Sequence, residues 1–405
     1  MLTTEQAWSA IERHLQVLPA EPTPRLEAGG RVLASDLPAT VDMPQADVSA
    51  MDGYVCSGDV AAGESLPVVA TAAAGAPLDI ELKPGTAAKI MTGAVVPRGG
   101  DRVIPVESTD GGRDTVVFNI APQAGAHIRL CGEVVATGTP LLPAGSHLTP
   151  GAISLLASHG YREVPTHRRP TVSVMTTGDE VVPPETEPAP GQLRDSNTSF
   201  LLDAGRVSGL QFHSLGTAAD SSESLRERIP KGLESDVLLL CGGVSMGDYD
   251  LVEDILAELG CEQLFDRVAI QPGKPLVVAR HSARREGGWV FGLPGNPASV
   301  MVTYWLFVKP TLERLQGLPG GFWQGALAGV LDSPLPPGKG KDRFLPATVT
   351  FQDGTLRVRP FPPEGSHDVV SYGRGTALVR IRPGAGAASA GDPCEILPLT
   401  TWISG

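Results

Sequence analysis

The sequence predicts a multidomain α/β protein with a central parallel β-sheet domain, a mainly β domain and a small all-β C-terminal domain. Three observations support this prediction. Residues 170–318 alternate between short apolar runs and amphipathic stretches, which is the rhythm of a parallel sheet covered by helices. Residues from about 40 to 150 form short β-type runs broken by Gly and Pro. Residues 319–405 are rich in Pro and Gly and contain hairpin signals.

The N-terminal part is predicted to begin with a helix over residues 3–15. Thr3 and Gln6 have the spacing of a capping box, and apolar residues recur there with helical period. The stretch TPGAISLLASHG at 149–160 predicts a second helix, one that returns to this first element. We therefore expect an N-terminal helical and linker domain of residues 1–45, completed by 141–169. A mainly β domain, with strands at LPVVATA and TVVFNIA, would fill 46–140.

The central domain is expected to span residues 170–318. Its predicted strands are TVSVMTT, LQFHSLG, DVLLL, LVVAR and WVFGL. Its predicted helices are NTSFLLDAGRVSG, SESLRERIPKGL and LVEDILAEL, with PASVMVTYWLFVKPTLERL as one long closing helix. In the C-terminal domain of residues 319–405, Asp353-Gly354 predicts the type I′ turn of a hairpin.

Charge and composition exclude several classes of function. The net charge of −13 argues against nucleic acid as a partner. The longest apolar run, ASVMVTYWLFV at 298–308, is too short to span a bilayer. Five cysteines form no CxxC pair, and the first residues lack the apolar core of a signal peptide. We therefore expect a cytoplasmic protein that binds neither nucleic acid nor membranes.

Four glycine-containing loops map to the carboxyl edge of the predicted sheet or beside it, where open α/β sheets bind ligands. They are TTGDE (176–180), GGVSMGDYD (242–250), QPGKP (271–275) and GLPGNP (292–297). Each loop alone is also compatible with a plain turn or a helix start. Together they favour an anion site, for which Lys274 is the best cationic candidate because lysine is scarce in this chain.

Five acidic residues would gather near the same edge, namely Asp179, Glu180, Asp195, Asp248 and Asp250. A like charge about 4 Å from a phosphate costs about 4 kcal/mol at an effective dielectric of about 20. A divalent cation removes this conflict, because carboxylate and phosphate oxygens both suit Mg²⁺. The alternative is that Asp248 or Asp250 only caps the helix that follows. The residues alone therefore predict a Mg²⁺-dependent enzyme acting on a phosphorylated ligand.

The order of motifs along the chain resembles the MoeA family of molybdopterin molybdenumtransferases, which are related to the E domains of gephyrin and of its plant counterpart. These motifs are SAMDGY, IMTGA, TTGDE, GGVSMGDYD, PGKP and GLPGNP. The resemblance implies an elongated homodimer whose third domain is similar to molybdopterin adenylyltransferase. It implies adenylylated molybdopterin and molybdate as substrates, with Mg²⁺-dependent pyrophosphate cleavage and AMP release. Molybdopterin adenylyltransferase and molybdoenzyme apoproteins are further partners that it suggests.

The resemblance also implies roles for individual residues. Catalytic roles fall to Asp52, Asp179, Glu180, Asp250 and Lys274, with Asp52 supplied by the partner subunit. The metal ligands would be Glu180, Asp248 and Asp250. The substrates would be bound by Thr92, Gly93, Thr177, Asp195, Asn197, Gly242, Gly243, Ser245, Pro275, Gly295, Asn296 and Ser371.

Several positions depart from the family pattern, four of which bear on the expected site. Val134 stands where the family has an acid, Gln271 where it has Lys, Lys341 where it has Arg, and Thr376 where it has Asn. The phosphate and metal pocket is expected to be intact and the molybdate pocket to be altered. Two other functions therefore stay open. The chain could be a gephyrin-like scaffold or paralogue that binds without turnover, or a molybdopterin adenylyltransferase.

Overall fold

The structure is a computed structural model that describes residues 1–242, 249–284 and 286–400. It contains two compact units, described here one at a time. The first comprises Met1–Thr23, Gly30–Val32 and Pro165–Gly405, and the second Pro24–Gly29 and Leu33–Val164. The two units divide residues 1–45 between them, so the helix near the N-terminus and the helix predicted to return to it belong to different units. The four-part division expected from the sequence stays a prediction. Within the described ranges, each helix is too short or too polar to cross a membrane.

A six-stranded sheet forms the centre of the first unit, with strand order β15-β12-β16-β20-β19-β17. Strands β15, β12, β16 and β20 are parallel, whereas β19 is antiparallel to both of its neighbours. The α/β fold is confirmed, with one reversed strand and one strand, β17, that was not predicted. The bounds are β12 (Val172–Thr177), β15 (Phe212–Ala218), β16 (Val237–Cys241), β17 (Cys261–Arg267), β19 (Pro275–His281) and β20 (Trp289–Leu293).

Short connections explain the reversal of β19. Only residues 268–274 link it to β17, and only residues 282–288 link it to β20. A parallel pair needs a crossover of about a dozen residues or more, so both connections force antiparallel pairing. The reversal brings the start of β19 to the edge where the parallel strands end. The loop 271–275 therefore reaches that edge, as the position of Lys274 in the predicted anion site requires.

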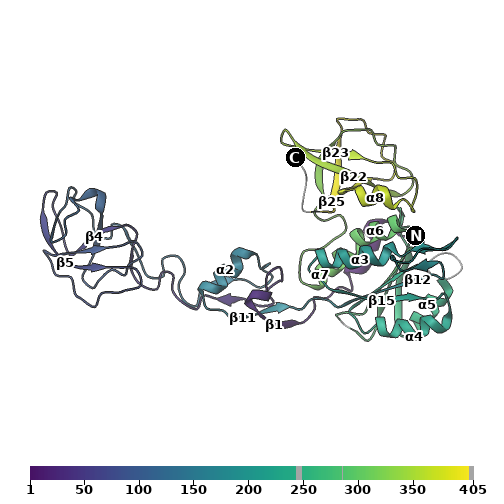
Figure 1. Ribbon diagram of the computed structural model, residues 1–405, viewed down its shortest axis with the longest axis horizontal. Helices are drawn as coiled ribbons and strands as arrows, with labels where there is room; N and C mark the ends of the chain where they lie inside the picture. The colour runs from purple at the N-terminus through teal and green to yellow at the C-terminus, as the bar shows by residue number, and fades with distance from the viewer. Residues whose placement is uncertain (243–248, 285, 401–405) are drawn as a thin grey trace. The chain divides into compact units, whose positions relative to one another are not determined.

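Helices cover both faces of this sheet (Figure 1). Alternation along β16 explains why both faces are apolar. Leu239 packs in one hydrophobic cluster with residues of α3, α6 and α7, whereas Leu238 and Leu240 pack in another with residues of α4 and α5. The bounds are α3 (Ser196–Val207), α4 (Ser222–Gly232), α5 (Tyr249–Glu258), α6 (Pro297–Thr303) and α7 (Lys309–Leu315).

The predicted closing helix is interrupted. A π-helical turn, Tyr304–Val308, separates α6 from α7. Pro310 lies at the start of α7 and has no N–H to donate to the preceding turn. The wider π-helical turn accommodates the missing hydrogen bond. Hydrophobic periodicity alone does not reveal this turn.

The N-terminal helix α1 (Thr4–Glu12) belongs to the first unit and is shorter than predicted. Its capping box is confirmed, because Thr3 Oγ1 accepts from Gln6 N at 3.2 Å and Gln6 Oε1 accepts from Thr3 N at 2.9 Å. The buried residues Ala7, Trp8 and Ile11 pack in the same cluster as the central sheet. This apolar face fixes α1 to the first unit.

The C-terminal part of the first unit is a second six-stranded sheet, of order β18-β22-β23-β21-β25-β24, and an added β22–β24 pairing closes it. The predicted hairpin turn is confirmed, since Asp353 and Gly354 have φ of 50° and 73°. Helix α8 (Val369–Arg374) precedes β24. The strands are β18 (Ile270–Gln271), β21 (Leu327–Leu331), β22 (Asp342–Gln352), β23 (Thr355–Pro360), β24 (Ala377–Ile381) and β25 (Pro393–Pro398).

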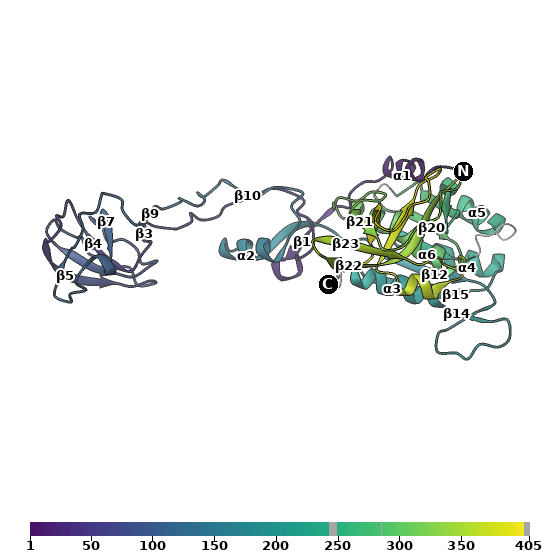
Figure 2. The same ribbon diagram turned by 90° about the horizontal axis from the view of Figure 1, so that it is seen from above.

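The second unit contains a five-stranded sheet of order β7-β4-β6-β5-β8 and the predicted helix α2 (Pro150–Ser158), capped by Thr149 (Figure 2). The strands are β4 (Gly53–Cys56), β5 (Ser65–Ala72), β6 (Ala87–Ile90), β7 (Arg102–Pro105) and β8 (Thr115–Val117). Shorter elements of the chain are β1 (Ala20–Pro24), β2 (Leu37–Pro38), β3 (Val48–Ser49), β9 (Ile128–Arg129), β10 (Pro140–Leu142), β11 (Glu163–His167), β13 (Val181–Val182), β14 (Leu193–Arg194) and the 3₁₀ turns Arg25–Glu27 and Val106–Ser108.

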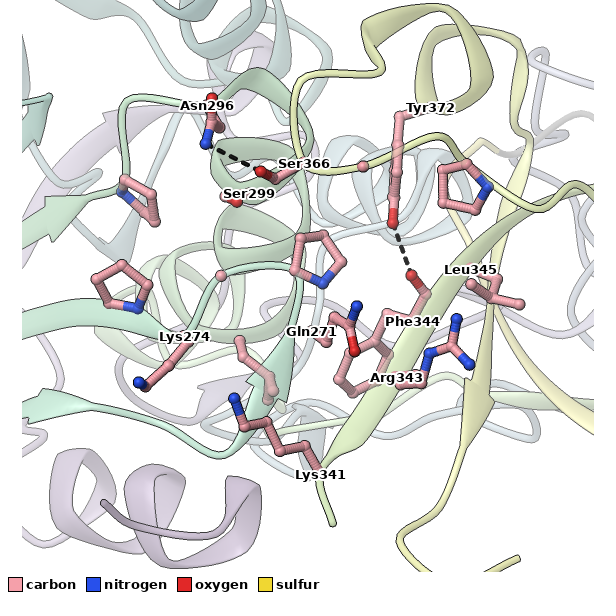
Figure 3. A pocket seen from close by; sticks show the side chains of 17 residues that line it. Gln271, Lys274, Asn296, Ser299, Lys341, Arg343, Phe344, Leu345, Ser366 and Tyr372 are labelled. Atoms are coloured by element: carbon pink, nitrogen blue, oxygen red, sulfur yellow. Dashed lines mark hydrogen bonds between the residues drawn. The ribbon is translucent and has the colours of Figure 1, made fainter. Parts of the chain in front are cut away.

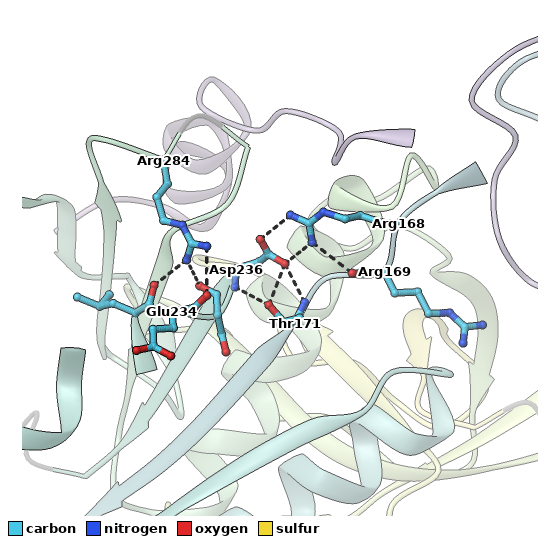
Figure 4. A network of polar contacts seen from close by, with 8 residues as sticks. Arg168, Arg169, Thr171, Glu234, Asp236 and Arg284 are labelled. Atoms are coloured by element: carbon cyan, nitrogen blue, oxygen red, sulfur yellow. Dashed lines mark hydrogen bonds and ion pairs between the residues drawn. The ribbon is translucent and has the colours of Figure 1, made fainter. Parts of the chain in front are cut away.

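A buried carboxylate, Asp236, ties together the starts of β12 and β16 (Figure 4). Arg168 donates to both of its oxygens, at 2.6 and 2.8 Å, and Thr171 donates its N–H and its hydroxyl at 2.8 and 3.0 Å. Burial alone would raise the pKa of Asp236, but the bonds from Arg168 and Thr171 outweigh it and hold the pKa below its ordinary value. Asp236 is therefore ionised in the folded protein at neutral pH.

We expect Asp236→Asn to lower the free energy of unfolding at pH 7 by about 1 to 2 kcal/mol, because a neutral amide cannot replace the bidentate ion pair. Since folding lowers this pKa, the stabilisation is complete above about pH 4 and is lost as the pH falls through the folded value. Urea titrations should therefore show a constant difference between variant and wild type above about pH 4, and a difference that shrinks as the pH falls below about 4. The exposed Asp203–Arg206 pair gives the control Asp203→Asn, which should change little. A difference for Asp236→Asn that is independent of pH would contradict this account.

Candidate active site

A cavity of about 600 Å³ opens where the parallel strands of the central sheet end. We call it the sheet-edge cavity. Residues that follow β12, β16 and β20 line it, together with residues at the start of α3. Eight residues predicted for the site line it, namely Thr177, Glu180, Asp195, Asn197, Gly242, Pro275, Gly295 and Asn296. Asp220 and His367 also line it and were not predicted.

The backbones of β12 and of the loop after β16 approach each other closely in this cavity. Gly242 has φ of 89°, and a Cβ at this position would lie 2.6 Å from the carbonyl oxygen of Thr177. Only glycine fits this conformation and this contact without a shift of the backbone. The Thr177 hydroxyl is buried and has no hydrogen-bond partner among the described residues. It is therefore available to a bound ligand.

The start of α3 is tied to the loop after β20. Asp195 caps α3 by accepting from Thr198 N at 2.9 Å. Asn197 donates from Nδ2 to the carbonyl of Gly295 at 2.7 Å, while its buried Oδ1 has no partner in the part of the chain that is described. Asn197 therefore positions the loop and can also bind a ligand through its carbonyl oxygen.

The acidic residues are only partly brought together. Glu180 and Asp195 line the sheet-edge cavity, whereas Asp179 is exposed and lines neither this cavity nor the one described next. Gly243, Ser245 and Asp248 lie outside the described residues, and of Asp250 only its place in α5 is described. Within the described ranges, no three His, Cys, Asp or Glu side chains lie close enough to hold a metal ion.

A second cavity, of about 460 Å³, lies beside the first and shares Pro275, Pro294 and Asn296 with it. Its lining includes the cationic residues Lys274, Lys341 and Arg343, and the described residues contribute no carboxylate to it (Figure 3). We call it the cationic cavity. Lys274 and the two departing positions, Gln271 and Lys341, all line it. This arrangement attracts a small multiply charged anion.

Two of the segments that line the cationic cavity carry its cationic residues, and we call them its walls. The loop 271–274 forms one, and the start of β22 forms the other, with β18 and β22 paired so that Gln271 lies opposite Arg343. Arg343 was not predicted, although period-two alternation from Lys341 along a strand would have indicated it. The guanidinium Nε of Arg343 is buried and lacks a partner among the described residues.

The C-terminal sheet domain contributes two polar groups that the sequence analysis missed. Asn296 donates from Nδ2 to the hydroxyl of Ser366 at 2.9 Å, which joins the loop after β20 to the loop before α8. The Tyr372 hydroxyl donates to the carbonyl of Phe344 at 2.8 Å, and burial raises its pKa well above the ordinary range. Tyr372 therefore stays neutral and contributes no negative charge to the cationic cavity.

Several predicted residues lie elsewhere. Ser371 lines neither cavity, because its hydroxyl donates to Asp368 at 2.6 Å in the cap of α8. Asp52, Thr92 and Gly93 belong to the second unit. There, Asp52 accepts from the N–H and the hydroxyl of Thr92 at 2.6 and 2.9 Å, and these bonds lower the pKa of Asp52. Asp52 is therefore a carboxylate at neutral pH.

Two of the four departures have local surroundings that do not involve the cavities. Thr376 accepts at its hydroxyl from Val349 N at 3.1 Å and so belongs to the C-terminal sheet. Val134 is exposed in the second unit. Only Gln271 and Lys341 among the departures therefore line a cavity of the first unit.

Models of known families match three successive stretches of the chain. Residues 2–160 match the MoeA N-terminal region (domain I and II), and residues 173–314 match a probable molybdopterin binding domain. Residues 328–399 match the MoeA C-terminal region (domain IV). The second and third matched stretches include every described residue that lines the two cavities.

Curated relatives match over most of the chain. Molybdopterin molybdenumtransferase from Nostoc sp. is 36% identical over 383 residues, which cover 92% of this chain and 87% of that protein. Molybdopterin molybdenumtransferase 2 from Mycobacterium tuberculosis is 35% identical over 391 residues, covering 93% and 94%. Among solved structures, the molybdopterin biosynthesis MoeA protein from Pyrococcus horikoshii matches with a TM-score of 0.82 and 29% identity, over 99% of this chain and 100% of that one.

Proposed function

The chain belongs to the MoeA family of molybdopterin molybdenumtransferases, and on this premise we propose the reaction that its two cavities serve. It is an enzyme of molybdenum cofactor biosynthesis. We propose that it inserts molybdate into adenylylated molybdopterin, with cleavage of the pyrophosphate bond and release of AMP, in a Mg²⁺-dependent reaction. The observation that carries this proposal is a cationic cavity directly beside a cavity at the carboxyl edge of the sheet.

The cationic cavity would bind molybdate. Molybdate is a small tetrahedral dianion, and Lys274, Lys341 and Arg343 offer it three positive charges with no opposing carboxylate in the described lining. Arg343 adds a planar fork of donors that lysine cannot supply. Arg343 therefore offsets part of the loss of molybdate affinity that is expected from Gln271 and Lys341, the two departures at this site.

The sheet-edge cavity would bind adenylylated molybdopterin. Its position at the carboxyl ends of parallel strands is the usual place for a nucleotide-like ligand. The unpartnered Thr177 hydroxyl and Asn197 Oδ1 would bind its polar groups, and Gly242 would let its phosphate approach the backbone. We propose that Gly243 and Ser245, which follow Gly242 in the sequence, complete this phosphate site.

Magnesium fits the acids near the sheet-edge cavity. Glu180 and Asp195 both line the cavity, and bare carboxylates would repel a phosphate bound there. We propose Glu180, Asp248 and Asp250 as the ligands of the metal. Bound Mg²⁺ would neutralise negative charge on the pyrophosphate as it is cleaved.

We further propose that the enzyme is a homodimer in which Asp52, Thr92 and Gly93 complete the site of the partner subunit. The ionised Asp52, held by Thr92, is a suitable group for orienting a cationic or metal-bound substrate. Molybdopterin adenylyltransferase and molybdoenzyme apoproteins would be the proteins that deliver the substrate and receive the product.

One assay tests the reaction. Purified protein is incubated with adenylylated molybdopterin, molybdate and Mg²⁺, and AMP is quantified by chromatography. We expect AMP release to require molybdate and to fall at least tenfold when EDTA removes the metal. Adenylylation of molybdopterin from ATP would instead identify an adenylyltransferase. Binding of adenylylated molybdopterin without AMP release would identify a non-turnover scaffold.

A further inference from the structure

Asp342 lies between two residues of the cationic cavity but faces away from it. Lys341 and Arg343 line the cavity, and the alternation of side chains along β22 directs Asp342 to the other side, where it is 3% exposed. A buried carboxylate at this place needs partners, and those partners determine how this wall of the cavity is held.

The partners of Asp342 come from both ends of the chain. Arg380 of β24 donates to its two oxygens at 2.7 and 2.9 Å, and the buried Thr4 hydroxyl of α1 donates to Oδ2 at 2.5 Å. Arg380 also donates to Glu5 of α1 at 2.5 Å. The first turn of α1 is therefore bonded to the wall that carries Lys341 and Arg343.

The same N-terminal segment is bonded to the residues that directly precede the other wall. Leu2 donates its N–H to the carbonyl of Arg267 at 3.3 Å and accepts from Ala269 N at 2.8 Å, just before the loop that carries Gln271 and Lys274. Asp342 N also donates to the carbonyl of Ala269 at 3.0 Å. Residues 2–5 thus bond to β22, which carries one wall of the cationic cavity, and to the residues that directly precede the other wall, without lining the cavity.

We propose that the N-terminal segment Leu2–Glu5 is a staple that sets the spacing of the two walls, with Thr4 and Asp342 as positioning residues for the oxyanion. This inference rests on the proposed function, because it takes the cationic cavity to be the molybdate site. Cations on separate walls bind one small anion well only at a fixed separation, and a shift well below 1 Å already weakens several charge-assisted bonds together. Loosening the staple should therefore affect molybdate binding more than the chemical step.

Thr4→Val is the decisive variant, because it keeps the shape of the side chain and removes only the hydroxyl that binds Asp342. We expect the molybdate concentration for half-maximal turnover to rise about three- to tenfold while kcat stays within about twofold. Calorimetric titration with molybdate should show the same loss of affinity without any turnover. Thr4→Ser, which keeps the hydroxyl, should restore affinity to within about twofold of wild type.

Two controls separate the staple from its alternatives. Thr171→Val removes a hydroxyl that donates to another buried aspartate, Asp236, at 3.0 Å and accepts from Asp236 N at 2.9 Å, in a part of the first unit that lines neither cavity. Thr171→Val should destabilise the protein at least as much as Thr4→Val but leave molybdate affinity unchanged. A loss of affinity equal to that of Thr4→Val would overturn the staple.

Lys341→Ala tests the cavity itself. If Lys341→Ala weakens molybdate binding and Thr4→Val does not, the staple is wrong. If Lys341→Ala has no effect, the assignment of the cavity to molybdate fails instead, and the effect of the staple on an oxyanion fails with it.

Discussion

Lys274→Gln is expected to raise the molybdate concentration for half-maximal turnover about thirty- to a hundredfold. The substitution removes one of three cationic residues from a cavity whose described lining has no carboxylate to compensate. A unit charge about 4 Å from an anion contributes up to about 4 kcal/mol at an effective dielectric of about 20, and the exposure of Lys274 reduces this value. Steady-state kinetics at fixed ionic strength, with calorimetric titration of molybdate, would measure the effect.

Lys339→Gln is the matched control for this prediction. Lys339 is an exposed lysine two positions before Lys341 in the sequence and lines neither cavity. Its loss changes the net charge by the same amount, so it should alter half-saturation by less than about twofold. Equal effects of the two substitutions would mean that Lys274 acts only through the overall charge of the protein and does not contact the oxyanion.

The sequence was most informative where structure depends on local physics. The capping box of Thr3 and Gln6 and the turn at Asp353-Gly354 need only neighbouring residues, and both are confirmed. The direction of β19 was missed, although the short connections on either side would have indicated it. The π-helical turn before α7 could not be read from periodicity, because its apolar residues continue the helical pattern.

The candidate site was predictable where loops follow strands of one sheet. Thr177, Asn197 and Gly242 meet in the sheet-edge cavity because parallel strands end at one edge. Residues contributed by the C-terminal sheet domain depend on how that domain packs, which no short sequence pattern encodes. Ser371 was assigned from the family resemblance, whereas the serine of the C-terminal sheet domain that lines the cationic cavity is Ser366, five positions earlier.

Gly242→Ala is expected to lower the free energy of unfolding by about 2 to 3 kcal/mol and to weaken binding of adenylylated molybdopterin at least thirtyfold. The added Cβ would lie 2.6 Å from the carbonyl oxygen of Thr177, on a residue whose φ is 89°. Either the loop after β16 or the end of β12 must then move, and both line the sheet-edge cavity. Denaturant titration and calorimetry with the adenylylated pterin would measure the two effects.

Two other glycines separate the causes of this loss. Gly191 has a similar φ of 90°, and no atom of the described residues lies within 4 Å of an added Cβ, so Gly191→Ala reports the backbone strain alone, at about 1 kcal/mol. Gly295 lines the same cavity without a positive φ, and among the described atoms its added Cβ would meet Gly242 Cα alone, at 3.7 Å, so Gly295→Ala should change stability by less than about 1 kcal/mol. The excess loss in Gly242→Ala then measures the contact with Thr177. The contrary outcome is that Gly242→Ala lowers the free energy of unfolding no more than Gly191→Ala does and still binds the adenylylated pterin normally. The loop after β16 would then move without cost, and the close approach of the two backbones would not shape the site.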